Sequence, residues 1–257
     1  QRSGNNQGVF DMANIESREI RYSAAGAEMI GTLFWDSDID GVRPGVIVVH
    51  EWWGANDYPK KRAAMLAEAG YAGFAVDLYG AGRVAANPQE AGQLMDALVG
   101  DTAVLRDRFN AALSALRNDE VADAEKMAAI GYCMGGGVVL HMARYGAGLA
   151  AVASFHGALP LGVAAAGEGQ DVLARVAVYH GEADEFITMA DADAFRKEMD
   201  HAGADLLFML LPGCTHGFTN PLATQRGIEY GLPLRYSARA DRISWDHMLL
   251  VLEFAFA

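Results

Sequence analysis

Residues 127–136, Met-Ala-Ala-Ile-Gly-Tyr-Cys-Met-Gly-Gly, form the stretch that decides the fold of this 257-residue chain. The apolar run Met127–Ile130 predicts a buried strand, and residues 135–144 predict a helix directly after it. Cys133 stands at the turn between them, with glycines at positions 131 and 135. Small residues two positions before and after a strained turn allow the strand and the helix to pass closely. The stretch therefore predicts a strand, an exposed thiol and a helix in succession.

Cys133 is the candidate nucleophile. At the N-terminus of a helix, the macrodipole and the free backbone N–H groups favour a thiolate. The alternative is a buried structural cysteine, which is the usual role of a lone cysteine in apolar surroundings. The turn between a strand and a helix favours the nucleophile.

Strands and helices alternate on both sides of this turn. The predicted strands are residues 46–49, 72–76, 127–130, 150–155, 176–179 and 206–211, and the predicted helices are 57–68, 88–117, 135–144, 190–201 and 244–254. An antiparallel hairpin of residues 18–23 and 29–35 precedes them, and residues 161–170 read as a loop. This order predicts an α/β protein with a mostly parallel, doubly wound sheet and helices on both faces. Ligands bind such sheets at the carboxyl ends of the strands.

The composition narrows the class of protein. Hydrophobic residues make up 52% of the chain, enough for one large core, so residues 12–257 are expected to form a single domain. The formal net charge of -13 argues against a nucleic acid or a membrane as partner, because both attract clustered Lys and Arg. Residues 1–11 lack a secretory signal and are interpreted as a leader added for expression. With no targeting signal and only two cysteines, the expected location is the cytoplasm.

Partners for the thiol follow later strands. In hydrolases with a nucleophile at such a turn, an acid follows a late strand and a histidine lies in the last major loop. Asp184 follows the strand predicted at 176–179, and His216 follows the strand at 206–211. His216 is expected to take the thiol proton, and Asp184 to orient the imidazole. This chain order predicts the α/β-hydrolase fold.

Other residues compete for these roles. Glu182 and Glu185 lie as close to the strand end as the favoured acid, so spacing alone does not exclude them. Among the remaining histidines, His50, His156 and His180 each follow an apolar run and are interpreted as pocket wall.

Hydrolysis through a tetrahedral intermediate requires an oxyanion hole. Its donors are the backbone N–H after the nucleophile and one from the loop after an early strand. These positions are Met134 and Trp52.

Four segments in combination resemble the dienelactone hydrolase family. They are HEWWG at 50–54, DLYG at 77–80, GYCMGG at 131–136, and HGEADEFI from 180 with CTHGF from 214. The resemblance extends from about residue 17 to 256. It implies a catalytic triad of Cys133, His216 and Asp184, no cofactor, and an acidic residue, Glu51, that contacts the thiol before substrate arrives. A carboxylate there disfavours the thiolate, so Glu51 is expected to restrain the nucleophile; the alternative is a simply solvated side chain.

The resemblance has one departure that concerns the substrate. Dienelactone enzymes hold a substrate carboxylate with two arginines, whose positions are occupied here by Ala81 and Asn220. Arg83 is a candidate substitute. Four aromatic residues are expected at the pocket mouth and favour an apolar or aromatic substrate, unless they serve only packing: Trp52, Trp53, Tyr79 and Phe218.

These observations predict a cysteine hydrolase of small carboxylic esters or lactones that forms an acyl-cysteine. An activated thiol is also expected to attack activated aryl esters and phosphate triesters. The protein is expected to be a monomer or a small homo-oligomer. A glutamine amidotransferase is disfavoured because Phe218 stands where a carboxylate should follow the histidine. Acyl transfer to another acceptor, and a redox-sensing or binding module that pairs Cys133 with Cys214, stay open.

Overall fold

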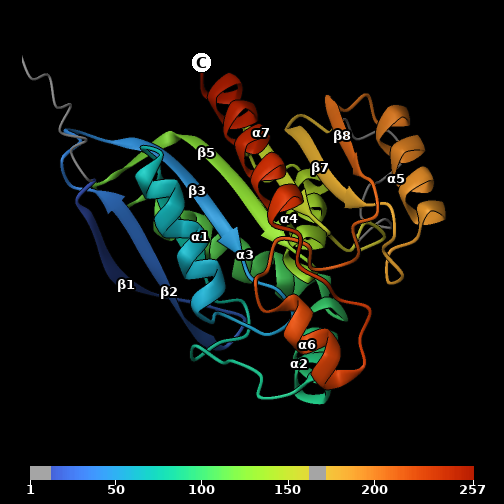
Figure 1. Cartoon of the computed structure of the whole chain (residues 1–257). Coiled ribbons are helices and arrows are strands. Elements are labelled where there is room, and N and C mark those ends of the chain that lie inside the picture. The colour runs from blue at the N-terminus through green and yellow to red at the C-terminus, as the bar shows by residue number, and fades with distance from the viewer. Residues whose placement is uncertain (1–12, 162–171) are drawn as a thin grey trace, which may run out of the picture.

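One eight-stranded sheet runs through the computed structural model, which describes residues 13–161 and 172–257 (Figure 1). The strands lie in the order β1-β2-β4-β3-β5-β6-β7-β8. They are β1 (Ile15–Ala24), β2 (Ala27–Asp36), β3 (Arg43–Val49), β4 (Ala72–Val76), β5 (Ala122–Tyr132), β6 (Ala151–Phe155), β7 (Arg175–Gly181) and β8 (Leu206–Leu211). From β4 to β8 all neighbours are parallel, whereas β1, β2 and β4 pair antiparallel. The predicted mostly parallel sheet and its opening hairpin are confirmed.

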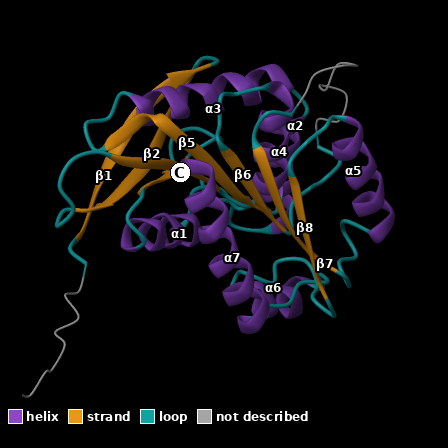
Figure 2. Cartoon of the chain, turned by 90° about the horizontal axis from the view of Figure 1, so that it is seen from above, coloured by secondary structure: helices purple, strands orange, loops and turns teal. Residues whose placement is uncertain are grey.

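Helices cover both faces of this sheet (Figure 2). On one face, α1 (Asp57–Glu68) and α7 (Ala238–Phe256) bury apolar side chains against the strands. On the other face, α3 (Thr102–Arg117), α4 (Met134–Tyr145) and α5 (Met189–His201) do the same. The two remaining helices are α2 (Pro88–Val99) and α6 (Ala223–Tyr230).

Burial explains why these residues form strands and helices. All five residues of β4 are buried, which is typical of a parallel strand covered on both faces. In α3, Leu105, Phe109, Ala112 and Leu116 recur every three or four residues and form its buried face.

The helices differ from the prediction in three places, one of which is α7, which begins at Ala238 and not at residue 244. The helix predicted at 88–117 is divided, because the Asp101 side chain accepts hydrogen bonds from the N–H groups of Ala103 and Val104, both at 3.1 Å, and begins α3 there. Helix α6 was not predicted at all.

Several calls fall outside the described residues. These are the leader at 1–11 and all of the loop at 161–170 except Leu161. Within 13–161 and 172–257, no helix is long and apolar enough to cross a membrane.

Candidate active site

Cys133 occupies the sharp turn between β5 and α4. Its φ of 55° and ψ of -120° lie outside the regions that non-glycine residues normally adopt. A Cβ atom on Gly131 would lie 2.0 Å from the Gly135 carbonyl oxygen, and one on Gly135 would lie 2.5 Å from the Val49 oxygen. Glycine is therefore required at both positions for β3, β5 and α4 to approach as closely as they do.

Asp184 and His216 meet at the same edge of the sheet. The distance from His216 Nδ1 to Asp184 Oδ2 is 2.8 Å, and both side chains are buried. The other carboxylate oxygen accepts the N–H groups of Phe186 and Ile187. Burial raises the pKa of Asp184, but the bonds to His216 and the backbone outweigh it and hold the pKa below its usual value. The competing acids Glu182 and Glu185 are exposed.

The imidazole of His216 is also hydrogen-bonded to Cys133. Burial lowers its pKa, whereas the charge of the Cys133 thiolate and the Asp184 carboxylate raise it, to about 10. At neutral pH the imidazole of His216 is therefore expected to be protonated and to lie beside the Cys133 sulfur.

The raised pKa of His216 predicts a pH dependence of stability. Because the pKa of His216 is raised above its unfolded value of about 6.5, the interactions of the protonated ring stabilise the fold fully below pH 6.5, and this stabilisation is lost as pH rises towards about 10. Cys133→Ala removes one of the groups that raise the pKa of His216. We expect NMR to find the His216 titration at lower pH in this variant, and its free energy of unfolding to fall less between about pH 7 and 10. An unchanged titration would contradict the pairing.

A narrow pocket adjoins the thiol. Its enclosed volume is about 20 Å³, room for a single water molecule. The pocket is lined by Glu51, Trp52, Trp53, Cys133, His216, Gly217, Asn220, Ala223, Arg226 and Leu234.

Glu51 is buried in this pocket and held from two sides. Its Oε2 accepts a hydrogen bond from Asn220 Nδ2 at 2.6 Å and lies 3.9 Å from Arg226 Nη1. Burial raises the pKa of Glu51, against the opposing effects of Asn220 and Arg226. Among the hydrogen bonds of the described residues, Glu51 is joined to Asn220 and not to Cys133, although both Glu51 and Cys133 line the pocket. Restraint of the thiol by Glu51 stays a prediction.

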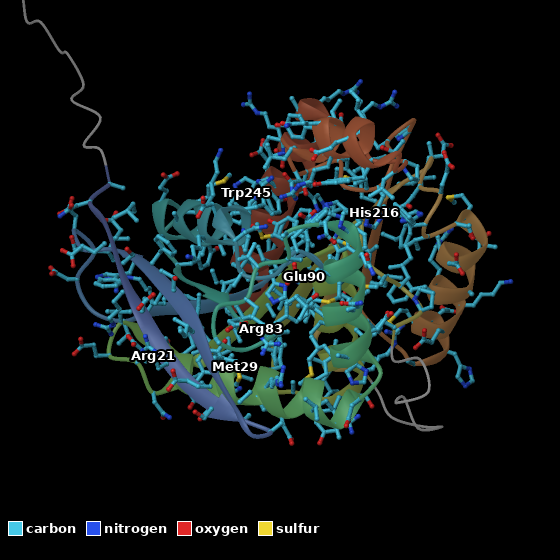
Figure 3. The ribbon with its side chains drawn as sticks, turned by 90° about the horizontal axis from the view of Figure 1, so that it is seen from below. Arg21, Met29, Arg83, Glu90, His216 and Trp245 are labelled. Carbon is cyan, nitrogen blue, oxygen red and sulfur yellow. The ribbon has the colours of Figure 1, made fainter. Side chains whose placement is uncertain are left out.

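Arg226 is the pocket residue that sequence reasoning missed. It lies on α6, its guanidinium stands 4.3 Å from the ring centre of Trp53, and its buried Nη1 has no hydrogen-bond partner among the residues that the structure describes. Arg83 is exposed and does not line the pocket, and Figure 3 shows it apart from His216. The available signal for α6 was Gly231, a left-handed residue that ends the helix.

The aromatic residues divide into two groups. Trp52 and Trp53 line the pocket. Tyr79 is buried beneath them and donates to the Trp52 carbonyl at 2.9 Å, and Phe218 is fully buried. Tyr79 and Phe218 thus support the wall without forming it.

The proposed oxyanion donors lie beside the thiol. Met134 is the first residue of α4, where backbone N–H groups have no acceptor within the helix. Trp52 lies in the turn after β3 and lines the pocket. Their role stays a prediction.

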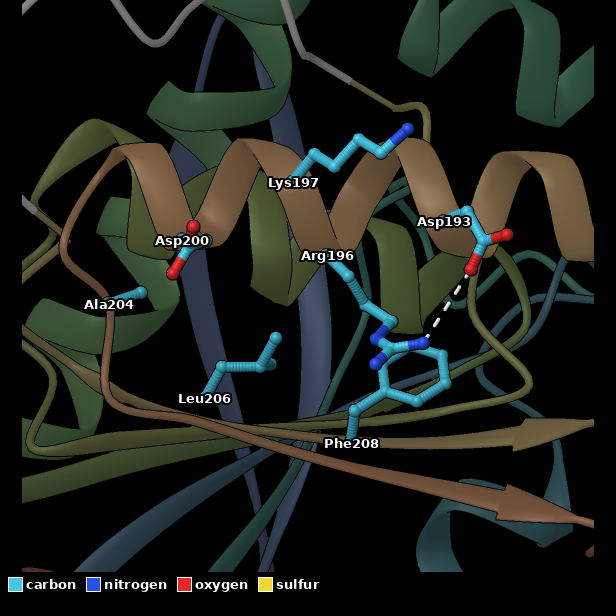
Figure 4. Close-up of a pocket in the computed structure, with 7 residues that line it drawn as sticks. All are labelled: Asp193, Arg196, Lys197, Asp200, Ala204, Leu206 and Phe208. Carbon is cyan, nitrogen blue, oxygen red and sulfur yellow. Dashed lines mark ion pairs between the residues drawn. The ribbon is translucent and has the colours of Figure 1, made fainter.

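A wider hollow of about 750 Å³ lies between α5 and β8 (Figure 4). An ion pair of 3.5 Å joins Arg196 and Asp193 there, and the described residues that line the hollow include no cysteine or histidine. Among the residues in the described ranges, no three His, Cys, Asp or Glu side chains are grouped to hold a metal ion. The narrow pocket at Cys133, which is lined by a thiol, an imidazole and a carboxylate, is therefore the candidate active site.

The strand order and the strained turn after β5 define an α/β hydrolase. Residues 33–255 match the model of the dienelactone hydrolase family, and the chain belongs to this family.

Its relatives include solved and curated proteins. The crystal structure of the dienelactone hydrolase-like promiscuous phosphotriesterase P91 from metagenomic libraries is 35% identical, with a TM-score of 0.88, over 95% of this chain and 100% of that one. An uncharacterised protein of Caenorhabditis elegans is 36% identical over 60% of this chain and 95% of its own length. A putative carboxymethylenebutenolidase of Aquifex aeolicus is 28% identical, over 69% and 77%.

Proposed function

We propose that the chain hydrolyses small carboxylic esters or lactones with Cys133 as the nucleophile. The observation that carries this proposal is the buried chain of contacts from Asp184 through His216 to Cys133, at the mouth of the pocket. A thiolate is the reactive form of cysteine, and an imidazolium beside it is ready to donate a proton.

The reaction takes two stages. The thiolate attacks the carbonyl carbon, and the N–H groups of Met134 and Trp52 bind the oxyanion. As the intermediate collapses, His216 gives its proton to the departing alkoxide, leaving an acyl-cysteine. His216 then takes a proton from water, which attacks the thioester and releases the acid and the thiolate.

The pocket lining suggests the kind of substrate. Trp52 and Trp53 offer apolar surface, and the unbonded Nη1 of Arg226 offers one donor to an acceptor group. The family and the putative carboxymethylenebutenolidases among its relatives support lactones and esters. Likeness to P91 supports a second, promiscuous activity on phosphate triesters, in which the same thiolate attacks phosphorus.

A trapped intermediate tests the nucleophile. Because the pocket is narrow, we expect p-nitrophenyl acetate, which carries a small acyl group, to be hydrolysed. Rapid acid quenching and peptide mass mapping should find one acetyl group on the peptide that contains Cys133. The peptide with Cys214 is the internal control. Turnover with acetylation elsewhere, or with no thioester, would overturn the proposal.

A further inference from the structure

His156 adopts a conformation that histidine rarely takes. It follows β6 directly, is fully buried, and has a φ of 40°, in the left-handed region. Such strain persists only where surrounding contacts hold the residue in place. The ring of His156 makes those contacts.

Both ring nitrogens of His156 are engaged. Nδ1 accepts the backbone N–H of Cys133 at 3.2 Å, which it shares with the Phe155 carbonyl oxygen at 3.0 Å, and Nε2 lies 2.7 Å from Thr219 Oγ1. Since Nδ1 accepts, the proton resides on Nε2, which donates to the threonine hydroxyl. Thr219 stands three residues after His216 in the same loop. The ring thus joins the turn that bears the thiol to the loop that bears its base.

The far end of this bridge is anchored in the core. Thr219 Oγ1 lies 2.6 Å from the Tyr58 hydroxyl, and its carbonyl oxygen accepts from Arg62 Nη2 at 2.7 Å. Arg62 is buried and also pairs with Asp241 of α7. Movement of the bridge would therefore disturb contacts with α1 and α7.

The His156 ring, which links Cys133 to Thr219, is also expected to be neutral, as its position beside the charged His216 requires. The rings of His156 and His216 meet edge to face, with 5.1 Å between their centres. Burial and the neighbouring charge of His216 lower the pKa of His156 well below its usual value. A neutral ring keeps Nδ1 free to accept and adds no second positive charge beside the imidazolium.

We propose that His156 is a positioning residue, which holds the Cys133 backbone and the His216 loop in register for transfer of the proton between thiol and imidazole. It is absent from the residues that line the pocket, so it acts through its two hydrogen bonds and not on the substrate. The inference rests on the proposed function. A displacement of reacting groups by about 1 Å lowers the rate by up to roughly 100-fold, and we expect the loss of His156 to lower kcat on this scale.

Three variants distinguish the effect of the hydrogen bond at His156 Nδ1 from the effect of the bond at Nε2. His156→Phe keeps the ring and removes both nitrogens. His156→Asn places an amide oxygen near Nδ1 and tolerates a positive φ. His156→Gln places an amide near Nε2 instead. We expect kcat for p-nitrophenyl acetate to fall roughly 10- to 100-fold in the Phe variant with KM within about twofold, and the Asn variant to recover most of the loss.

Alkylation of Cys133 by iodoacetamide supplies a second readout, because it reports thiolate geometry without turnover. We expect the rate to fall in the Phe variant and to recover in the Asn variant. Melting temperatures of all variants identify any loss of folding. His180→Phe is the matched control. His180 is a buried histidine at the end of the adjacent strand and, contrary to the pocket-wall role predicted for it, is not among the described residues that line the pocket at Cys133. Neither of its ring nitrogens has a hydrogen-bond partner among these residues. Its kcat should stay within about twofold.

Two outcomes overturn the proposal. One is a Phe variant with wild-type kcat and alkylation rate. The other is an equal loss in the Asn, Gln, Phe and His180→Phe proteins that follows their melting temperatures, which would indicate packing alone. Failure of the proposed function looks different, because Cys133→Ala would then retain activity whatever the His156 variants do.

Discussion

Replacing Cys133 with alanine should lower kcat/KM for p-nitrophenyl acetate by about 10⁴-fold or more, because it removes the sulfur that attacks the carbonyl carbon and carries the acyl group. An alanine at position 133 would have to adopt the same φ of 55° as Cys133, and Ala81 already adopts this φ elsewhere in the chain. The backbone strain should therefore change little, and the fold should be retained. The measurement is steady-state kinetics with mass analysis for the adduct. Residual activity in the variant should come from binding and the oxyanion donors alone.

Cys214→Ala provides the control for this variant. Cys214 is the other free thiol of the chain, is half-buried, and does not line the pocket at Cys133. Its kinetics should stay within about twofold of wild type. Equal turnover by wild type and Cys133→Ala would remove the nucleophile from the mechanism. A large loss in the Cys214 variant would favour a pair of interacting thiols.

Changing Asp184 to asparagine should lower kcat by about 10³- to 10⁴-fold with little change in size or packing. The carboxylate accepts from His216 Nδ1 and helps to raise the imidazole pKa. An amide keeps the bonds from the backbone N–H groups but can present its NH₂ group to the ring, which favours the wrong tautomer. It also removes the charge that stabilises the imidazolium. In the variant, both the maximum value of kcat/KM and the pH at which kcat/KM changes should therefore differ from wild type.

The two neighbouring glutamates test whether this effect is specific. Glu182 and Glu185 are both exposed, and Glu182 accepts only a weak bond, 3.3 Å, from the N–H of Gly213. Glu182→Gln and Glu185→Gln should each keep kcat within about twofold. A loss in either that matches Asp184→Asn would mean that the acid has been assigned to the wrong residue.

Much of the architecture was predictable because it depends on local patterns. Apolar runs bounded by Gly and charge predict buried parallel strands. All eight strands and most helices were located this way or as the opening hairpin, and β5 begins earlier than predicted. The division between α2 and α3 was missed because the apolar pattern continues across it. The Asp101 side chain begins α3 by accepting the backbone N–H of Ala103, and this bond forms only once the chain has left α2.

The sequence by itself determined the turn at Cys133, since Gly131 and Gly135 each lie two positions from it along the chain and Gly131 approaches Gly135 itself. It also determined that the groups after β7 and β8 share an edge with the thiol, because parallel strands end on the same side. The tertiary structure alone decided which of three carboxylates faces His216, and that Asn220 and Arg226 surround Glu51. Glu51 and Asn220 are separated by 169 residues, and His156 and Thr219 by 63. Residue patterns report on neighbours a few positions apart, whereas these contacts depend on how distant loops pack together.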